Sequence, residues 1–513
     1  MPTLPLRTGV PAPDRTADVC LIIEGAYPYV AGGVSSWVQD LIKAHPDLSF
    51  HLVALVADRT AQALKYTLPD NVCGLSHIYL QEMDKGSKRP RGLGQLFEAL
   101  GQPLQSLQRG GGLQEIAQVN TLLVPYRGRL GAAALLNSPE AWEVLCRIYD
   151  QEVPESSMLD YFWSWRALLG GMFAVMTAPL PRAAIYHSVS TGYAGLLAAR
   201  AKLETGRPTI LTEHGIYTNE RRIEIMMADW LFDGIDRGVG LNRNGRDLRD
   251  LWIDTFISYA RACYNARDQV ITLYGGNQVL QRQLGSPESR MRIIPNGIDY
   301  DRYAALPRPS QRRRPRVALI GRVVPIKDIK TYIQACAVLC RDNPEVEALI
   351  LGPEDEDPGY VAECRQLAAD LGLNGNLRFT GRVQLDEYLP EIDVVVLTSI
   401  SEAQPLTILE AGAIGIPSVV TDVGSCRELI FGRADEDPDL GPGGAVTPVA
   451  SPAETAAALA KLIRDPEWRR RCGEAMQNRV ERYYNKRVID RIYGDLYRDL
   501  RQHAPSSLLR EVV

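Results

Sequence analysis

The sequence predicts an α/β protein made of two Rossmann-like doubly wound domains, with a helical insertion in the first domain. Three observations support this prediction. The chain has 513 residues, which is too long for one hydrophobic core. A strand, a glycine-rich turn and a helix follow one another over residues 18–44, as at the start of a doubly wound domain. The same alternation restarts after residue 316, which indicates a second domain of this kind.

Composition excludes several classes of protein. Hydrophobic residues make up 45% and charged residues 23% of the chain, which is typical of a globular protein and excludes disordered, collagen-like and coiled-coil chains. Lys and Arg number 57 against 62 Asp and Glu, so the formal net charge is −5. Because the chain carries no uniform positive field, we expect no nucleic-acid partner.

Cysteine usage and hydropathy indicate the compartment. Nine cysteines in a long chain, an odd number, do not form a secreted disulfide framework. The closest pair, Cys336 and Cys340, has no second pair at zinc spacing, so no metal is expected. The start of the chain lacks the apolar core of a signal peptide, and the nearly charge-free run 167–180 is shorter than the ~20 residues of a membrane helix. We expect a cytoplasmic protein, or one held at the inner membrane through partners.

The first elements build the opening of the first domain. The apolar run 18–23 fits a buried parallel strand. Residues 24–33 form a turn rich in glycine, and residues 34–44 place their apolar side chains on one helical face. A second strand is expected at 50–57.

The alternation of strands and helices then becomes irregular between about residues 60 and 180, and we interpret this region as a helical insertion. Its basic cluster at 85–91 is predicted to be a solvated loop, with a docking surface as the alternative. Residues 139–147 and 159–176 have a helical pattern. Their aromatic side chains, Trp163 among them, are expected in the core, with stacking on an acceptor sugar as the alternative.

The alternation of strands and helices resumes after the insertion and continues through the rest of the chain. In the first domain, taken as residues 1–306, strands are expected at 184–188, 209–212, 269–273 and 292–294. Residues 307–316 are rich in Pro and Arg and are the expected linker. In the second domain, taken as 317–482, strands are expected at 317–320, 347–351, 377–379, 393–397 and 418–421. Ligands bind at the carboxyl ends of such strands, so the site is expected there.

Two glutamates give the strongest chemical pattern. Glu402 follows a strand, and Glu410 lies eight residues later in the next helix. Pro405 suits a first helical position, so the backbone N–H groups near Leu406 and Thr407 are expected to form an anion site. The carboxylates would accept hydrogen bonds from sugar or ribose hydroxyls. Taken alone, surface glutamates favoured near a helix start explain the pattern equally well.

Other candidates are two cations and a glycine pair. Arg322 and Lys327 follow the strand 317–320 and suit a diphosphate, although an isolated pair of this kind is more often solvated. Gly32 and Gly33 end the first turn without the G-x-G-x-x-G spacing, so a dinucleotide cofactor is disfavoured. The glycine pair would let backbone approach a phosphate, but a simple turn is the better interpretation in isolation.

Histidine supplies the last candidate. His214 follows the strand 209–212 and could donate to a sugar hydroxyl or transfer a proton, although a lone His is more often a packed residue. His187 is a weaker candidate of the same kind. The sequence contains no G-x-S-x-G, so it does not indicate a serine hydrolase.

Together these residues resemble the retaining, nucleotide-sugar-dependent glycosyltransferases of family 4, which have the GT-B fold. The matching residues are Gly32, Gly33, His214, Asn296, Gly297, Ile298, Asp299, Gly321, Arg322, Lys327, Glu402 and Glu410. Residues 22–37 and 212–217 and the insertion resemble the branch that makes the Pel exopolysaccharide of biofilms. The resemblance implies two domains facing across a cleft, and a final helix within 483–513 that returns to the first domain.

The resemblance also implies roles for the candidate residues. Arg322 and Lys327 would hold the donor diphosphate, while Glu402 contacts sugar hydroxyls and Glu410 contacts the ribose. His214 would lie near the transferred sugar. The remaining donor-binding residues would be Gly32, Gly33, Asn296, Leu406 and Thr407. One departure is Ala403-Gln404, where the family often has Gly-Phe or Gly-Tyr.

The implied activity is retaining, metal-independent transfer of a hexosyl unit from a UDP-sugar to a growing Pel-type exopolysaccharide. UDP-glucose or a UDP-N-acetylhexosamine would be a substrate, and no cofactor is expected. The implied partners are the donor, the polysaccharide acceptor and an inner-membrane synthesis or secretion complex. Two alternatives stay open: a GT-B-fold sugar-nucleotide epimerase or phosphorylase, and a non-catalytic nucleotide-sugar-binding subunit of a secretion complex.

Overall fold

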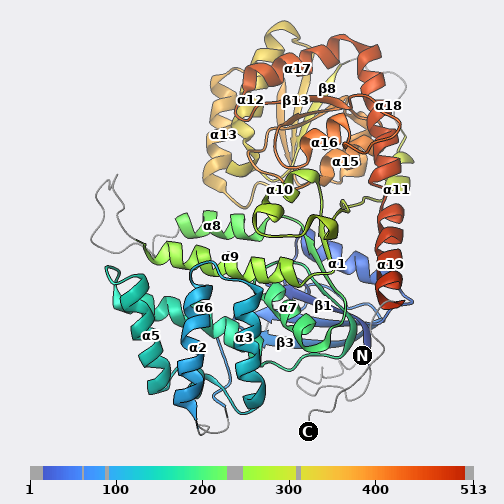
Figure 1. Cartoon of the computed structure of the whole chain (residues 1–513). Coiled ribbons are helices and arrows are strands. Elements are labelled where there is room, and N and C mark those ends of the chain that lie inside the picture. Colours follow the sequence, from blue (N-terminus) through green and yellow to red (C-terminus); the bar gives the residue numbers. More distant parts are fainter. Residues whose placement is uncertain (1–15, 61–62, 87–91, 228–245, 308–313, 503–513) are drawn as a thin grey trace, which may run out of the picture. The chain divides into compact units, whose positions relative to one another are not determined.

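The computed structural model describes residues 16–60, 63–86, 92–227, 246–307 and 314–502 (Figure 1). It divides into two compact units. The first comprises Met1–Thr272, Asn277–Arg292 and Gly494–Val513, and the second comprises Leu273–Gly276 and Ile293–Tyr493. The main boundary therefore falls ahead of the expected linker at 307–316, of which residues 308–313 lie outside the described residues.

The first unit is built on a parallel seven-stranded sheet with the order β3-β2-β1-β4-β5-β6-β7. Its strands are β1 (Ala17–Glu24), β2 (Phe50–Val56), β3 (Val72–Tyr79), β4 (Ala183–Ser188), β5 (Thr209–Glu213), β6 (Gln269–Thr272) and β7 (Met291–Ile293). Parallel neighbours need crossover connections, here helices such as α1 (Gly33–Ala44) and α7 (Tyr193–Thr205). Strand β3 lies inside the region that was interpreted as a helical insertion. The sequence did not indicate this strand, because its residues are mostly half-buried and show no apolar run.

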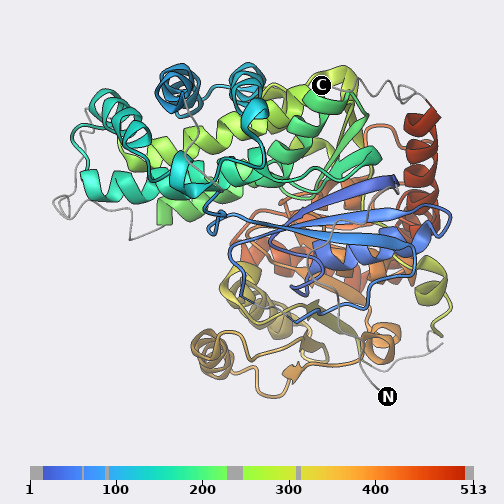
Figure 2. The same ribbon diagram turned by 90° about the horizontal axis from the view of Figure 1, so that it is seen from below.

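Helices fill the rest of the segment between β3 and β4. They are α2 (Leu93–Leu107), α3 (Leu113–Leu123), α4 (Ala132–Leu135), α5 (Pro139–Glu152) and α6 (Met158–Thr177). Figure 2 shows these blue-to-teal helices gathered beside one another and against α9 (Leu248–Ala266). They share one apolar core, which includes Trp165. The expectation that Trp163 is a core residue is wrong, because its side chain points outward and is exposed.

One sequence expectation in this unit falls partly outside the described residues. Of the basic cluster at 85–91, Lys88, Arg89 and Arg91 lie outside them. Helices α8 (Tyr217–Met227) and α9 follow β5, and residues 228–245 between them also lie outside the described residues.

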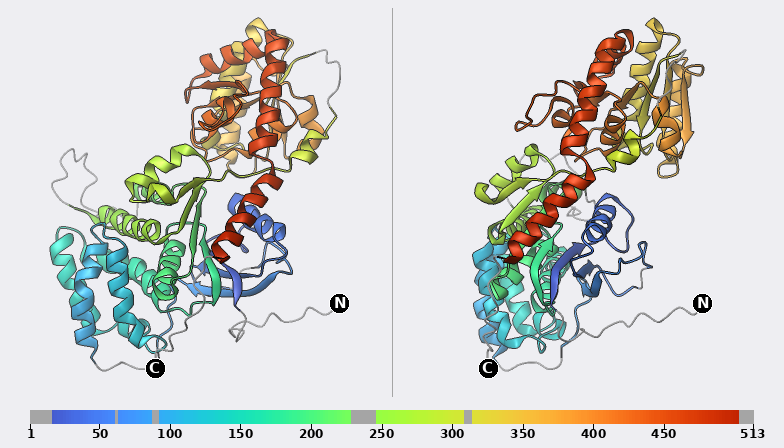
Figure 3. Two further views of the ribbon diagram at one scale, coloured as in Figure 1. Left: turned by 45° about the vertical axis from the view of Figure 1, so that its right-hand side comes forward. Right: turned by 90° about the vertical axis from the view of Figure 1, so that its right-hand side faces the viewer.

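The second unit has a parallel six-stranded sheet with the order β10-β9-β8-β11-β12-β13. Its strands, followed by colour in Figure 3, are β8 (Arg316–Ile320), β9 (Glu347–Leu351), β10 (Leu377–Gly381), β11 (Val394–Leu397), β12 (Ser418–Thr421) and β13 (Gly444–Thr447). Strand β13 was not expected from the sequence. It is four residues long and lies at the edge of the sheet.

Helices cover both faces of this second sheet. One core contains side chains of α12 (Ile329–Asp342), α13 (Pro358–Asp370) and α17 (Pro452–Arg464). The other contains side chains of α11 (Tyr300–Ala304), α15 (Leu406–Ala413), α16 (Cys426–Phe431) and α18 (Pro466–Tyr483). A parallel sheet covered on both faces is doubly wound, so the predicted α/β class with two Rossmann-like units is confirmed.

The last helix, α19 (Lys486–Gln502), contributes its final part to the first unit, from Gly494 on. There the Tyr497 hydroxyl lies 2.7 Å from Nδ1 of His187, in strand β4, and both side chains are buried. The Tyr497 ring also contacts the rings of His45 and Phe50. Within the described residues, none of the helices has the length and apolarity that a membrane span requires.

Candidate active site

The second unit brings Lys327 and Glu402 together. Lys327 ends the short 3-10 turn Pro325–Lys327 after β8, and Glu402 lies in the loop between β11 and α15. The Lys327 Nζ is 2.5 Å from Glu402 Oε1, and the two side chains are 20% and 14% exposed. Ser399 Oγ donates to the same carboxylate oxygen at 2.6 Å. The carboxylate therefore holds the ammonium in one orientation at the carboxyl ends of two adjacent strands.

Backbone contacts fix the two loops that carry this pair. Thr398 Oγ1 donates to the carbonyl oxygens of Lys327 and Asp328, at 3.0 and 2.9 Å. The N–H of Ile400 donates to the carbonyl oxygen of Ile326 at 3.0 Å. A Cβ at Gly424 would lie 2.0 Å from the carbonyl oxygen of Glu402. The glycine is therefore needed for the close packing of the Glu402 loop.

Helix α15 begins beside Glu402. It starts at Leu406, with Pro405 as N-cap, one residue later than the sequence suggested. No side chain caps this end of the helix. Its first N–H groups, those of Leu406 and Thr407 included, have no acceptor one turn earlier within the helix, so they present positive partial charge to an anion.

Glu410 lies one turn further along α15, where Tyr303 of α11 positions it. The Tyr303 hydroxyl donates to Glu410 Oε1 at 3.0 Å. Burial raises the pKa of Glu410 above its usual value, and the hydrogen bond from Tyr303 opposes that shift. This carboxylate is held in place and retains a second oxygen that can accept a hydrogen bond.

Arg322 and Asn296 have other contacts. The exposed guanidinium of Arg322 pairs with Glu356, its Nη1 lying 2.6 and 2.7 Å from the two carboxylate oxygens. Asn296 is tied through its backbone to Gln404, whose Oε1 accepts from the Asn296 N–H at 2.8 Å and whose Nε2 donates to the Asn296 carbonyl at 3.3 Å. Gln404 is one of the two residues that depart from the family pattern, and here it attaches the Glu402 loop to the 294–298 segment.

The remaining candidates belong to the first unit. Gly32 is the N-cap of α1, and a Cβ at Gly32 or Gly33 would meet no atom within 4 Å, so sterics alone do not require these glycines. His214 follows β5, and its ring packs edge-on against Trp37 with the centroids 4.8 Å apart. The structure thus places Gly32, Gly33, His187 and His214 in the first unit and the other predicted residues, Asn296, Arg322, Lys327, Glu402, Leu406, Thr407 and Glu410, in the second.

Sequence reasoning missed two carboxylates of the first unit. Glu24 ends β1 and accepts hydrogen bonds from the Tyr217 hydroxyl at 2.7 Å and the Ala194 N–H at 3.1 Å. Glu213 ends β5, is buried, and accepts from the Tyr264 hydroxyl at 2.7 Å. Burial raises the pKa of both carboxyls. The available signal was an acidic residue at the end of an otherwise apolar strand.

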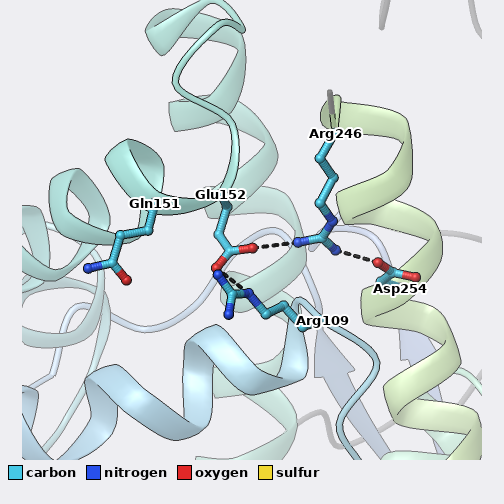
Figure 4. A pocket seen from close by; sticks show the side chains of 5 residues that line it. All are labelled: Arg109, Gln151, Glu152, Arg246 and Asp254. Atoms are coloured by element: carbon cyan, nitrogen blue, oxygen red, sulfur yellow. Dashed lines mark hydrogen bonds and ion pairs between the residues drawn. The ribbon is translucent and has the colours of Figure 1, made fainter. Parts of the chain in front are cut away.

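A pocket of about 400 Å³ lies elsewhere, among α2, α5 and α9 of the first unit (Figure 4). The buried carboxylate of Glu152 forms one ion pair with Arg109 and another with Arg246, each at 2.6 Å. Arg246 also pairs with Asp254. Because two cations face two anions, these charges cancel, and we interpret the cluster as a structural link between the inserted helices and α9.

Comparison with known protein families identifies both parts of the chain. Residues 17–289 match the family described as "Domain of unknown function (DUF3492)". Residues 307–479 match the family "Glycosyl transferases group 1". The second match contains Arg322, Lys327, Glu402 and Glu410, so the site described above lies within it.

Curated relatives match over a shorter stretch. The D-inositol 3-phosphate glycosyltransferase of Geodermatophilus obscurus is 29% identical over 194 residues, which are 35% of this chain and 41% of that protein. The alpha-D-kanosaminyltransferase of Streptomyces kanamyceticus is 30% identical over 192 residues, 36% of this chain and 46% of that protein. The chain spans about half the length of the curated relatives it matches.

Solved structures match over nearly the whole chain. HepE of Anabaena, in complex with UDP and glucose, has a TM-score of 0.54 at 16% identity and covers 94% of this chain and 100% of its own. Sucrose-phosphate synthase of Thermosynechococcus elongatus has a TM-score of 0.55 at 17% identity and covers 95% and 100%. At these identities the likeness shows the fold alone. Residues 307–479 match the group 1 glycosyl transferase family, the solved structures show the GT-B fold, and through residues 17–289 the chain belongs to the DUF3492 family.

Proposed function

We propose that the protein transfers a sugar, with retention of configuration and without a metal, from a UDP-sugar to a growing exopolysaccharide of the Pel type. The observation that carries the proposal is the Lys327–Glu402 pair beside the uncapped start of α15, inside the segment that matches group 1 glycosyltransferases. The complex of HepE with UDP and glucose supports a UDP-sugar donor, such as UDP-glucose or a UDP-N-acetylhexosamine. The polysaccharide acceptor and a membrane-bound synthesis complex are inferred from the sequence resemblance.

The site offers matching groups for each part of such a donor. The ammonium of Lys327 and the first N–H groups of α15 suit the diphosphate. Glu402 suits a sugar hydroxyl, and the second oxygen of Glu410 suits a ribose hydroxyl. Arg322 would break its ion pair with Glu356 and bind the donor diphosphate instead. Asn296, Leu406 and Thr407 complete the donor set.

In the proposed reaction the bond between the anomeric carbon and the diphosphate oxygen breaks, and its electron pair leaves with UDP. The acceptor hydroxyl oxygen bonds to the anomeric carbon on the same face, and its proton passes to the departing phosphate. Lys327 and α15 stabilise the charge that grows on the leaving group, which is the electrostatic contribution that usually dominates such catalysis. His214 would lie near the transferred sugar.

The donor is tested first by binding and then by turnover. We expect UDP-glucose or a UDP-N-acetylhexosamine to raise the melting temperature, and UDP to be released when a polysaccharide fragment is added. Stabilisation by GDP-mannose but by no UDP-sugar would overturn the donor assignment. Donor binding without UDP release, or an isomerised nucleotide sugar as product, would replace transfer by the binding-subunit or the epimerase alternative.

The site assignment is tested by Lys327→Ala. Loss of one preorganised cation at the leaving group should lower the rate of UDP release roughly 10²- to 10³-fold. The matched control is Lys330→Ala, three residues later, where an exposed ammonium pairs with Glu363 at 2.6 Å and has no role in the proposed reaction. Full turnover by Lys327→Ala would show that the donor binds elsewhere.

A further inference from the structure

Helix α6 is apolar on two opposite faces. One face is buried in the core of the first unit and includes Tyr161, Trp165 and Leu168. The opposite face carries Leu159 and Trp163, one turn apart, whose side chains are 65% and 59% exposed. A helix that is apolar all round is normally covered on all sides, and an exposed apolar patch on a monomer is often functional.

Aromatic contacts hold this exposed face in a defined shape. Phe162 contacts Trp163 with centroids 5.2 Å apart, and Trp142 of α5 with centroids 6.0 Å apart, both edge-on. The Arg166 guanidinium lies 5.5 Å from the centroid of the Phe162 ring. Trp142 is itself 49% exposed. Tryptophan and arginine in a preorganised cluster are the residues that most often supply binding energy at protein interfaces.

We propose that this face, made by Trp142, Leu159, Phe162, Trp163 and Arg166, binds the same face of a second copy of the chain. The charges around Trp163 favour this partner. Asp160 lies three residues before Trp163, and Arg166 lies three residues after it.

A two-fold axis at Trp163 would pair the two α6 helices in antiparallel orientation. In such a pair each residue before Trp163 is level with the residue equally far after it on the second copy. Asp160 of each copy then faces Arg166 of the other, and Leu159 faces Ala167, which is also exposed. The face is therefore complementary to itself in charge and in apolar surface.

A lipid surface fits the same face less well. Lipid-binding helices carry an excess of Lys and Arg beside their apolar face. Here the exposed Glu143 of α5 and the half-buried Asp160 and Arg166 of α6 contribute two acidic groups and one basic group. Such a balance favours contact with a protein surface that carries both signs.

The first test is the oligomeric state of the full chain by light scattering and sedimentation equilibrium. We expect a dimer, and we expect Trp163→Asp to raise the dissociation constant at least about tenfold while the circular dichroism spectrum stays that of the folded wild type. The control is Val338→Asp, at a 42% exposed apolar position on α12. A wild-type chain that stays monomeric up to about 100 μM would overturn the proposal. So would a monomer that sediments with phosphatidylglycerol vesicles through Trp163.

The second test uses reversed charges. Asp160→Arg and Arg166→Asp should each prevent self-association, because each places like charges opposite one another twice. When mixed, the two variants should form a hetero-dimer, since every pair again joins opposite charges. Arg166 also donates to Asn137 Oδ1 at 2.6 Å, so circular dichroism must first show that Arg166→Asp is folded. If that variant does not fold, failure of Asp160→Arg to weaken the dimer overturns the proposed pairing. With both variants folded, a mixture that stays monomeric overturns it.

Discussion

Gln404 shows how one side chain can position the loop that carries Glu402. Its amide forms two hydrogen bonds with the backbone of Asn296, a residue 108 positions away in the sequence. The side chain of Gln404 is buried, so these bonds are made out of contact with water. A phenylalanine at this place could not form them.

Removal of the amide should therefore be costly. Gln404→Ala leaves the N–H of Asn296 without its acceptor, and we expect a loss of about 1–3 kcal/mol in the free energy of unfolding. Because the loop also carries Glu402, the KM for the donor should rise as well. Urea denaturation and donor titration measure the two effects. The control is Gln366→Ala, on the exposed side of α13, which should change neither quantity.

Glu410 gives a prediction that depends on pH. Its pKa is raised in the folded protein by burial, so the folded chain holds the proton at pH values at which the unfolded chain has lost it. The stability from this group is complete below the unfolded pKa of about 4.5 and is lost as the pH rises through the folded pKa. Glu410→Gln removes this loss.

We therefore expect Glu410→Gln to be more stable than the wild type at pH 7 and equally stable near pH 4. The same variant should bind the donor less tightly, because the amide accepts less strongly from a ribose hydroxyl. Melting temperatures across this pH range test the first expectation, with the exposed Glu387→Gln as control. A constant difference between pH 4 and pH 7 would contradict the assigned cause.

The sequence could predict part of the site but not its contacts. Lys327 and Glu402 were recognisable because each follows an apolar strand, where the sheet topology gathers ligand-binding groups, and Glu410 was recognisable by its spacing from Glu402. The partner of Arg322 was not recognisable, because Glu356 lies 34 residues away, after another strand. The same holds for Gln404 and Asn296. Such pairs depend on how loops pack, which no local pattern specifies.

At the scale of elements, the site depends on loops that approach one another closely. Gly424 has φ = 53° and would bring a Cβ to 2.0 Å from the carbonyl oxygen of Glu402. Gly424→Ala should therefore move the Glu402 loop, with a loss of activity as well as stability.

A substitution at a second glycine measures the effect of a positive φ alone, without the close contact made at Gly424. Gly372 has φ = 71°, but a Cβ there would meet no atom within 4 Å. Gly372→Ala should lose about 1 kcal/mol of stability from its positive φ and keep its UDP release. If Gly424→Ala were no worse than Gly372→Ala in the release assay, close packing at Glu402 would not matter for catalysis.

Most elements of both sheets were predictable, and the two missed strands have a common cause. β3 and β13 each lie at the edge of their sheet. Edge position alone does not explain why they were missed, since β7 and β10 are edge strands too and were expected; β3 and β13 also lack the continuous apolar run that marks a central parallel strand. The buried strands β1, β8 and β11 carry that run, and the sequence indicated them correctly.

At the scale of the whole molecule, buried His187 makes stability depend on pH. Burial lowers its pKa to about 3, with the nearby charges of Arg267 and His214 adding to the shift. Below pH 6.5 the unfolded chain takes up a proton that the folded chain does not, so stability should fall by about 1.4 kcal/mol per pH unit toward pH 3. His187→Gln should be less sensitive to acid. Equal slopes of unfolding free energy against pH would contradict this account.

The contact between His187 and Tyr497 also bears on synthesis of the chain. The first unit includes residues up to Arg292 and residues from Gly494 on, which are synthesised about 200 positions later. At roughly 5–20 residues per second a ribosome needs about 10–40 s for that interval. Throughout it, the surface of the first sheet that receives Tyr497 has no helix to cover it. The nascent chain should therefore expose a site for chaperones that closes only when α19 arrives.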